Sequence, residues 1–179
     1  MDDDADNPHG PFFMRFNGPD GVDLAREIEK ASIDLAKAKA DGDRMRQLKI
    51  ASVLGSMLTT FRQETAAVGL LEWALPLAYE LGDKKEEAGV LMNLATARQY
   101  LGQRDEAQVL FQQAFEMALD LGERELEAFI LHHRGRCYAE QGNSGAAKLC
   151  FERALFLREQ IGSDRAKNSK KALALLEDF

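Results

Sequence analysis

Glycine punctuates this chain at a fixed interval, and that regularity constrains the fold more than any other feature. Four glycines lie 40 residues apart and two more stand midway between them: Gly42, Gly82, Gly122 and Gly162, then Gly102 and Gly142. Self-similarity at a period of about 20 to 50 residues is typical of stacked supersecondary units. Each unit buries its apolar face only against its neighbours, and the stack leaves an extended concave surface. The spacing therefore predicts a solenoid of helical hairpins.

Small and apolar side chains keep the same period between the glycines. Three columns recur on the expected second helix of each unit: Ala67, Ala107 and Ala147; Leu71, Phe111 and Phe151; Ala74, Ala114 and Ala154. A column of small residues precedes them on the expected first helix: Gly55, Ala95 and Gly135. Small side chains let two helices approach closely, and a large side chain fills the space beside the contact. The aromatic residues of the second helices are accordingly expected in the core: Trp73, Phe111, Phe115, Phe151 and Phe156.

Composition and charge narrow the class of protein. Apolar residues make up 45% of the 179 residues, which is enough for a continuous core. No apolar stretch reaches the roughly 20 residues that span a bilayer, and the acidic start at Asp2, Asp3 and Asp4 is unlike a signal peptide. We therefore expect a soluble, cytoplasmic protein. A net charge of -7 argues against nucleic-acid partners and anionic membranes.

The expected organisation has two parts. Residues 1–21 hold three of the four prolines and are predicted to form a flexible, acidic segment. Residues 22–179 are predicted to form the solenoid, with a capping helix at 22–41, repeats at about 43–82, 83–122 and 123–162, and a second capping helix at 163–179. The individual helices are expected at 22–40, 43–60, 64–81, 83–101, 103–121, 123–141, 143–161 and 163–178. Six residues of the first helix fall near one face: Val22, Ala25, Ile28, Ser32, Leu35 and Ala36.

Local signals mark where these helices begin and end. A glycine after a helix accepts the left-handed conformation that closes it. The residues that follow four of the glycines are good N-caps: Asp43, Asp83, Asn143 and Ser163. Arg62 stands where Gly102 and Gly142 stand in the other two units. The first internal turn is therefore expected to differ in shape.

The repeated columns resemble the tetratricopeptide repeat family, whose unit is a helical hairpin with a small residue in its first helix and an alanine, aromatic and alanine set in its second. The resemblance covers about residues 43–161 as three repeats. The 40-residue period exceeds the family's usual length of about 34. It looks like the long-helix branch, which includes kinesin light chains, spindle-orientation adaptors and bacterial peptide-sensing regulators. The resemblance implies an all-α, right-handed solenoid of three hairpins with capping helices.

In this family the first helices line a concave groove that binds a peptide or protein segment. The resemblance therefore implies a non-catalytic interaction scaffold with these candidate partner-binding residues: Lys49, Ser52, Ser56, Met92, Asn93, Thr96, Tyr100, Phe129, His132, His133 and Arg136. Val53, Gly89 and Glu140 map to the same face. Asn93 either binds a partner's backbone, as in long-repeat relatives, or bonds within its own scaffold. The alternative function is a ligand- or peptide-responsive sensor that controls a separate effector.

No arrangement of residues indicates catalysis, a cofactor or a metal. The chain has no phosphate-cradling glycine loop and no nucleophile elbow. Cys137 and Cys150 align with apolar residues of the sister repeats, so both thiols are expected to be buried rather than bound to a metal. His132 and His133 are expected in the groove, either simply solvated or protonating near pH 6.5.

One apolar cluster interrupts the N-terminal segment. Phe12, Phe13 and Phe16 stand together with Met14 and Arg15. An exposed apolar cluster usually marks a contact site. Three contacts remain open: the molecule's own groove, self-association with a neighbouring copy, and packing on the first helix.

Overall fold

The computed structural model describes residues 12–15 and 21–178, and within these ranges it contains eight α-helices and no strand. The helices are α1 Gly21–Ala40, α2 Arg44–Thr60, α3 Glu64–Leu81, α4 Lys84–Tyr100, α5 Arg104–Leu121, α6 Arg124–Glu140, α7 Ser144–Gln160 and α8 Ala166–Leu176. Each predicted helix is present with its ends displaced by three residues or fewer. The all-α solenoid is confirmed. None of the eight helices combines the length and the apolar character that crossing a membrane requires.

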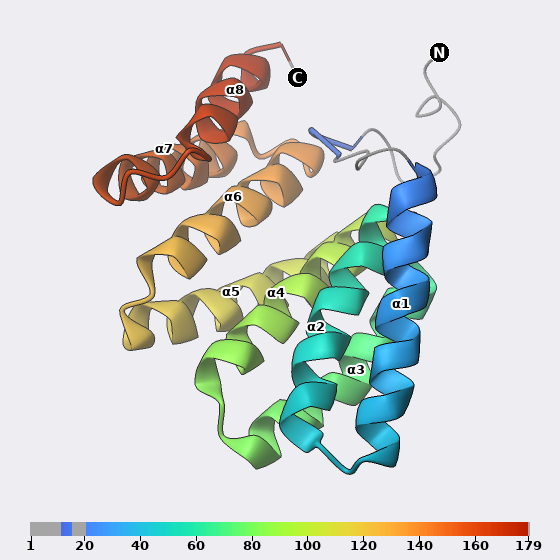
Figure 1. Cartoon of the computed structure of the whole chain (residues 1–179). Coiled ribbons are helices and arrows are strands. Elements are labelled where there is room, and N and C mark those ends of the chain that lie inside the picture. Colours follow the sequence, from blue (N-terminus) through green and yellow to red (C-terminus); the bar gives the residue numbers. More distant parts are fainter. Residues whose placement is uncertain (1–11, 16–20, 179) are drawn as a thin grey trace.

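The helices pair into three hairpins that stack along the chain (Figure 1). α2 packs on α3, α4 on α5 and α6 on α7, with α1 against α2 and α8 against α7. The first helices of the hairpins also contact one another in order, α2 with α4 and α4 with α6. The first helices therefore form one layer, and α3, α5 and α7 form the other.

Each hairpin closes around the column of small residues. A Cβ atom built on Gly55 would lie 2.6 Å from the side chain of Leu71, and one on Gly135 would lie 2.8 Å from the ring of Phe151. Contacts that short do not occur between carbon atoms, so these two sites hold glycine because the facing side chain fills the space. Phe111 and Phe151 are fully buried. This confirms the close packing that the repeated columns predict.

The buried face of α1 is displaced by one residue from the predicted one. Leu24, Leu35 and Ala38 are buried, and Ile28 packs against the same core, whereas Ser32 and Ala36 are exposed. A terminal helix contacts the stack on one side only, so its sequence tolerates small residues on both edges of that side. This tolerance explains the displacement, because alanines on the exposed edge imitate an apolar face.

The helix ends follow the predicted turn chemistry with one exception. The side chains of Asp43, Asp83 and Asn143 each accept a hydrogen bond from the backbone N–H three residues on, at 3.0 to 3.1 Å. Ser163 does not cap a helix in this way, because α8 begins only at Ala166.

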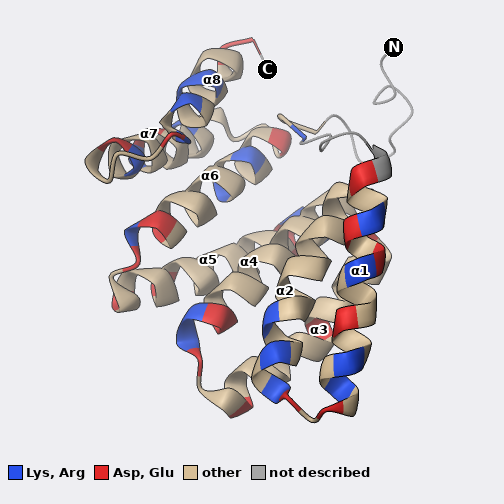
Figure 2. Ribbon diagram, in the orientation of Figure 1, with Lys and Arg blue, Asp and Glu red and all other residues tan. Residues whose placement is uncertain are grey.

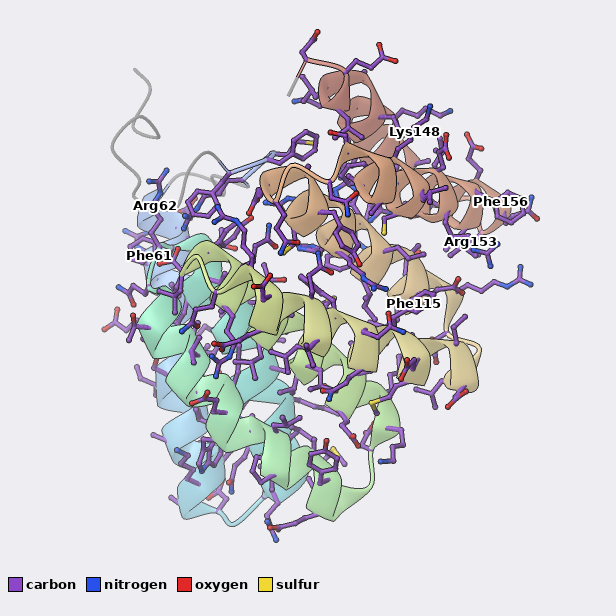
Figure 3. All side chains as sticks on the ribbon, turned by 180° about the vertical axis from the view of Figure 1, so that it is seen from behind. Phe61, Arg62, Phe115, Lys148, Arg153 and Phe156 are labelled. Atoms are coloured by element: carbon purple, nitrogen blue, oxygen red, sulfur yellow. The ribbon has the colours of Figure 1, made fainter. Side chains whose placement is uncertain are left out.

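The turn at Arg62, which is labelled in Figure 3, has the same left-handed conformation as the glycine turns, contrary to expectation. The φ angle of Arg62 is 63°, close to 79° at Gly102 and 73° at Gly142. The next residue, Gln63, donates its N–H to the carbonyl of Leu58 at 2.9 Å, and the two glycine turns make the equivalent bond. Helix packing on both sides sets this conformation, so a residue with a Cβ is held in a region that disfavours it.

We predict that Arg62→Gly raises the free energy of unfolding by about 0.5–1 kcal/mol. The left-handed conformation costs a residue with a Cβ about 1–2 kcal/mol, and the extra freedom of glycine in the unfolded chain offsets about half of that gain. Chemical denaturation measures the difference. The reverse change, Gly102→Arg in the sister turn, should destabilise by a similar amount. A neutral result for both variants would show that these turns store no strain.

Two aromatic residues predicted in the core lie at the surface instead. Trp73 is 40% exposed and Phe156 is 51% exposed, whereas Phe115 is half-buried. Cationic side chains cover both exposed rings: Nζ of Lys39 lies 4.1 Å from the centroid of Trp73, and the guanidinium of Arg153 lies 5.5 Å from that of Phe156 (Figure 3). These rings lie on the outer face of the second helices rather than in the contact between the two helices of a hairpin.

Candidate functional site

The seams between the first helices are built from the residues predicted to line the groove. Nδ2 of Asn93 donates to the carbonyl oxygen of Ser52 at 3.1 Å and to its Oγ at 3.2 Å, which joins α4 to α2. Oγ1 of Thr96 lies 3.4 Å from Nδ1 of His133, which joins α4 to α6. Asn93 therefore bonds within its own scaffold through its amide nitrogen. Its Oδ1 accepts no hydrogen bond from the described residues.

The candidate partner-binding residues divide by exposure. Six are less than a tenth exposed: Ser52, Met92, Thr96, Tyr100, His132 and Arg136. Asn93, Phe129 and His133 are half-buried, and Lys49 and Ser56 are exposed. The floor of the predicted groove thus consists mainly of contacts between helices. A partner can contact the six buried residues only if it displaces the part of the chain that covers them.

At the C-terminal ends of α4 and α6 the covering group is a piece of the chain itself, which we call the docked segment (residues 12–15). Its backbone is held at Phe13 by two side chains one turn apart on α6. The N–H of Phe13 donates to Oε1 of Glu140 at 3.1 Å, and its carbonyl oxygen accepts from Nε of Arg136 at 2.9 Å. We call Arg136 and Glu140 the clamp. The same guanidinium also donates to the hydroxyl of Tyr100.

The side chains of the docked segment supply its apolar anchors. Phe13 is 2% exposed and stacks on Phe151 with ring centroids 5.6 Å apart. Phe12 is 8% exposed and meets Tyr100 edge to face at 5.1 Å. Burying a phenylalanine side chain contributes about 1.5–3 kcal/mol. The two rings are therefore the main source of stability for the docked segment.

Arg15 fastens the other end of the docked segment. Its guanidinium forms a largely buried ion pair with Glu64 at the start of α3. It also lies over two aromatic rings, 4.3 Å from the centroid of Tyr100 and 4.9 Å from that of Phe12. A cation desolvated between rings in this way gains more than an exposed ion pair does.

The side chain of Glu140 is fully buried, and its carboxylate accepts hydrogen bonds from the docked segment and from the neighbouring helices. Gln99 donates to Oε1 at 2.7 Å and Nε of Arg104 donates to Oε2 at 3.2 Å. Burial raises the pKa of Glu140, while Arg136, the hydrogen bond from Gln99 and Arg104 act in the opposite direction. Two buried atoms beside it, Oε1 of Gln99 and one terminal nitrogen of Arg104, have no partner among the described residues. The site therefore holds spare hydrogen-bonding capacity.

The two histidines do not behave as solvated groove residues. Burial and the neighbouring charges of Arg158 and Arg136 lower the pKa of His132 to about 3. Burial and Arg136 hold the pKa of His133 well below its usual value, and its ring stacks on Phe129 at 4.8 Å. Protonation near pH 6.5 is therefore disfavoured for both in the folded chain, because a charged imidazole would lie beside the guanidinium groups of Arg136 and Arg158.

Both cysteines are buried thiols, as their alignment with apolar residues predicts. Cys137 belongs to the core of the second hairpin, and burial raises its pKa to about 12. Cys150 packs with Ala154 and Leu157, and burial also raises its pKa. Among the described residues, no three metal-ligating side chains come together.

The open part of the first-helix layer lies toward the N-terminal end of the stack. Val53 is 59% exposed there, beside a shallow depression of about 280 Å³ lined by Ala31, Asp34, Lys49, Ile50 and Val53. Figure 2 shows the charged residues of α2 and α4 gathered near the hairpin ends, with the middle of both helices free of charge. This surface is suited to an apolar contact with a charged rim.

The sequence analysis missed several residues of the site. Gln99 and Arg104 extend the network of Glu140, and Glu64 receives Arg15. Gln99 precedes Glu140 by 41 residues, which is nearly the repeat period, so a search for polar pairs one repeat apart would have found it. Nothing in the period points to Glu64, because the docked segment has no counterpart in the repeats. Phe16 lies outside the described residues.

The packing of the docked segment answers the question left open by its apolar cluster. Its recorded contacts are with α3, α4, α5, α6, α7 and α8, and none of those recorded for the described residues is with α1. The segment thus lies at one end of the molecule's own first-helix layer. The four described residues are packed rather than forming part of a free linker.

Comparison with known proteins gives a family and a fold. Residues 86–160 match the family described as "Tetratricopeptide repeat". Among solved structures, the crystal structure of BtubC (BKLC) from P. vanneervenii superposes with a TM-score of 0.67 at 17% sequence identity, covering 89% of this chain and 75% of that one. At that identity the likeness concerns the fold alone. No curated protein matches the sequence significantly.

Proposed function

We propose, from the match of residues 86–160 to the tetratricopeptide repeat family, that the chain is a non-catalytic interaction scaffold that holds a protein or peptide segment along its first-helix layer. Repeats of this family generally mediate contacts between proteins. What is specific to this chain is the location of the contact. It extends from the open depression beside Val53, across the half-buried side chains of Asn93 and His133, to the clamp on α6.

The observation that carries the proposal is the recognition of Phe13 by its backbone. The clamp satisfies one N–H and one carbonyl of a chain segment with side chains of α6. Backbone groups are common to every peptide, so a site that binds them accepts a chain segment as a class of ligand. Aromatic anchors beside the clamp then select among sequences. The free Oδ1 of Asn93 offers a further acceptor on the same layer.

The test compares two valines of equal exposure. Val53 on α2 and Val109 on α5 are both 59% exposed, so glutamate at either position has the same small effect on folding. Affinity capture from the source cell with quantitative mass spectrometry should show a partner that wild type and Val109→Glu retain and that Val53→Glu loses by at least about tenfold, the loss expected when a charge enters an apolar contact. A partner retained equally by both variants would place the contact on another surface.

If the protein is instead a ligand-responsive sensor, a different result is expected for a ligand that binds the first-helix layer. A small molecule or short peptide that acts as its signal stabilises the folded chain in proportion to its concentration. An increase of the melting temperature by such a ligand, in the absence of any protein partner captured through Val53, would favour the sensor.

A further inference from the structure

We propose that the clamp recognises a segment of a partner protein with the pattern aromatic, aromatic, any residue, arginine. The docked segment, which has this pattern, is the chain's own occupant of the site. The inference rests on the proposed function and adds the ligand chemistry and its competitor. Phe12, Phe13 and Arg15 supply the pattern, because each contacts a different part of the site.

The site is built to be filled by a chain segment rather than left empty. Removing residues 12–15 would leave the guanidinium of Arg136 and the carboxylate of Glu140 without their contacts to Phe13. The two groups keep their bonds to Tyr100, Gln99 and Arg104, but a polar group that loses one of its hydrogen-bond partners in a largely apolar site is less stable there. Exchange of one segment for another of the same chemistry avoids this state, so displacement by a partner is favoured over simple release.

The chain's own segment does not use the site completely. Met14 adopts a φ angle of 52°, a conformation that is uncommon for a residue with a Cβ. Oε1 of Gln99 and a terminal nitrogen of Arg104 stay unpaired beside Glu140. A partner with glycine at the position of Met14, or with polar groups that reach Gln99 and Arg104, makes contacts that the docked segment lacks. The internal occupant is therefore one that a better ligand can displace.

Tethering sets how strongly the two compete. A segment joined to its site by a short linker acts at an effective concentration of the order of millimolar. A free peptide of the same sequence must exceed that concentration to enter the intact protein. Vacating the site by mutation removes the competitor without touching the clamp.

The experiment therefore titrates a fluorescent peptide with the sequence Pro-Phe-Phe-Met-Arg-Phe, residues 11–16, into two forms of the full chain. The first is wild type and the second is Phe12→Ala/Phe13→Ala, in which the anchors are lost and the clamp is intact. We expect the double variant to bind the peptide at least about tenfold more tightly by fluorescence anisotropy. The variant Arg15→Ala leaves both phenylalanines in place and should show a smaller gain of about threefold, which provides a readout if the double variant folds poorly.

The control is made in the peptide, where folding is not at issue. Methylation of the amide nitrogen of the second phenylalanine removes the N–H that donates to Glu140, and should weaken binding to the double variant by at least about tenfold. Equal affinity of the plain and methylated peptides, or equal affinity of wild type and double variant, would overturn the inference.

Two further outcomes distinguish this inference from the proposed function and from exchange of the docked segment between two copies. Val53→Glu in the double variant should leave peptide binding unchanged, because Val53 lies far along the layer. If the peptide fails to bind while capture of a protein partner still depends on Val53, the clamp inference is wrong and the proposed function stands. Light scattering that finds wild type dimeric and the double variant monomeric would overturn the internal occupancy in favour of exchange between two copies.

Discussion

Replacing Phe111 by alanine should lower the free energy of unfolding by about 3–5 kcal/mol, the usual cost of truncating a fully buried phenylalanine. Phe111 has no exposed surface, and it lies in the core of the middle hairpin beside Ala95, Ala107 and Ala114. Alanine neighbours have no side-chain freedom with which to fill the space, so most of the cavity persists. The middle hairpin also contacts both others, so its loss should weaken the whole stack.

Phe156→Ala is the matched control. Phe156 is a phenylalanine on a second helix as well, but it is 51% exposed, and the guanidinium of Arg153 lies 5.5 Å from its ring centroid. Its truncation should cost less than about 1 kcal/mol. Urea denaturation followed by circular dichroism measures both variants. Equal losses for Phe111 and Phe156 would contradict the division of aromatic residues between core and surface described above.

The second large effect is a loss of stability in acid that originates at His132. Its pKa is about 3 in the folded chain and 6.5 in the unfolded chain, so the unfolded chain binds the extra proton between these values. Above pH 6.5 the His132 imidazole is neutral in both states and does not affect the free energy of unfolding. Below pH 6.5 the proton binds only to the unfolded chain, so the free energy of unfolding decreases until the pH nears 3. Between pH 7 and pH 5 the loss from this one group is about 2 kcal/mol. His133 acts in the same direction.

The variant His132→Met isolates this contribution. Met92 occupies the same repeat position in the second hairpin and is equally buried, so methionine fits the site by shape. We expect the decrease in stability between pH 7 and pH 5 to be about 2 kcal/mol smaller in the variant. Glu140, whose pKa is raised, acts in the opposite direction in both proteins and cancels in the comparison. An unchanged pH profile would show that His132 is hydrated in the folded chain.

The fold was predictable because its determinants are local and occur three times. The left-handed turns favour glycine, and the hairpin contact needs a small residue at Gly55, Ala95 or Gly135, so each requirement leaves a mark at a fixed interval. Arg62 was misjudged for the opposite reason. The packing of α2 on α3 imposes the turn, and a single unfavourable residue does not change it.

The candidate site was predictable only where it follows the repeat. Tyr100, Arg136 and Glu140 were assigned to the first-helix face by their register, and they do lie together. Their occupant could not be located, because residues 12–15 have no repeat counterpart and their contacts span many residues along the chain. The burial of His132 was missed because a histidine on a groove face looks the same in sequence whether water or a second helix covers it.

The path of the docked segment also changes how the molecule should come apart. In a linear stack each repeat contacts only the repeats beside it, so the two ends can unfold independently. Here Arg15 contacts the start of α3 while Phe13 packs with Ala172 and Leu176 of α8. The docked segment thus contacts both the first hairpin and the last helix, so the two ends of the stack are linked. Unfolding of α8 removes the packing of Phe13 and so weakens the contact of Arg15 with α3. We therefore expect the two ends of the stack to unfold in one cooperative transition.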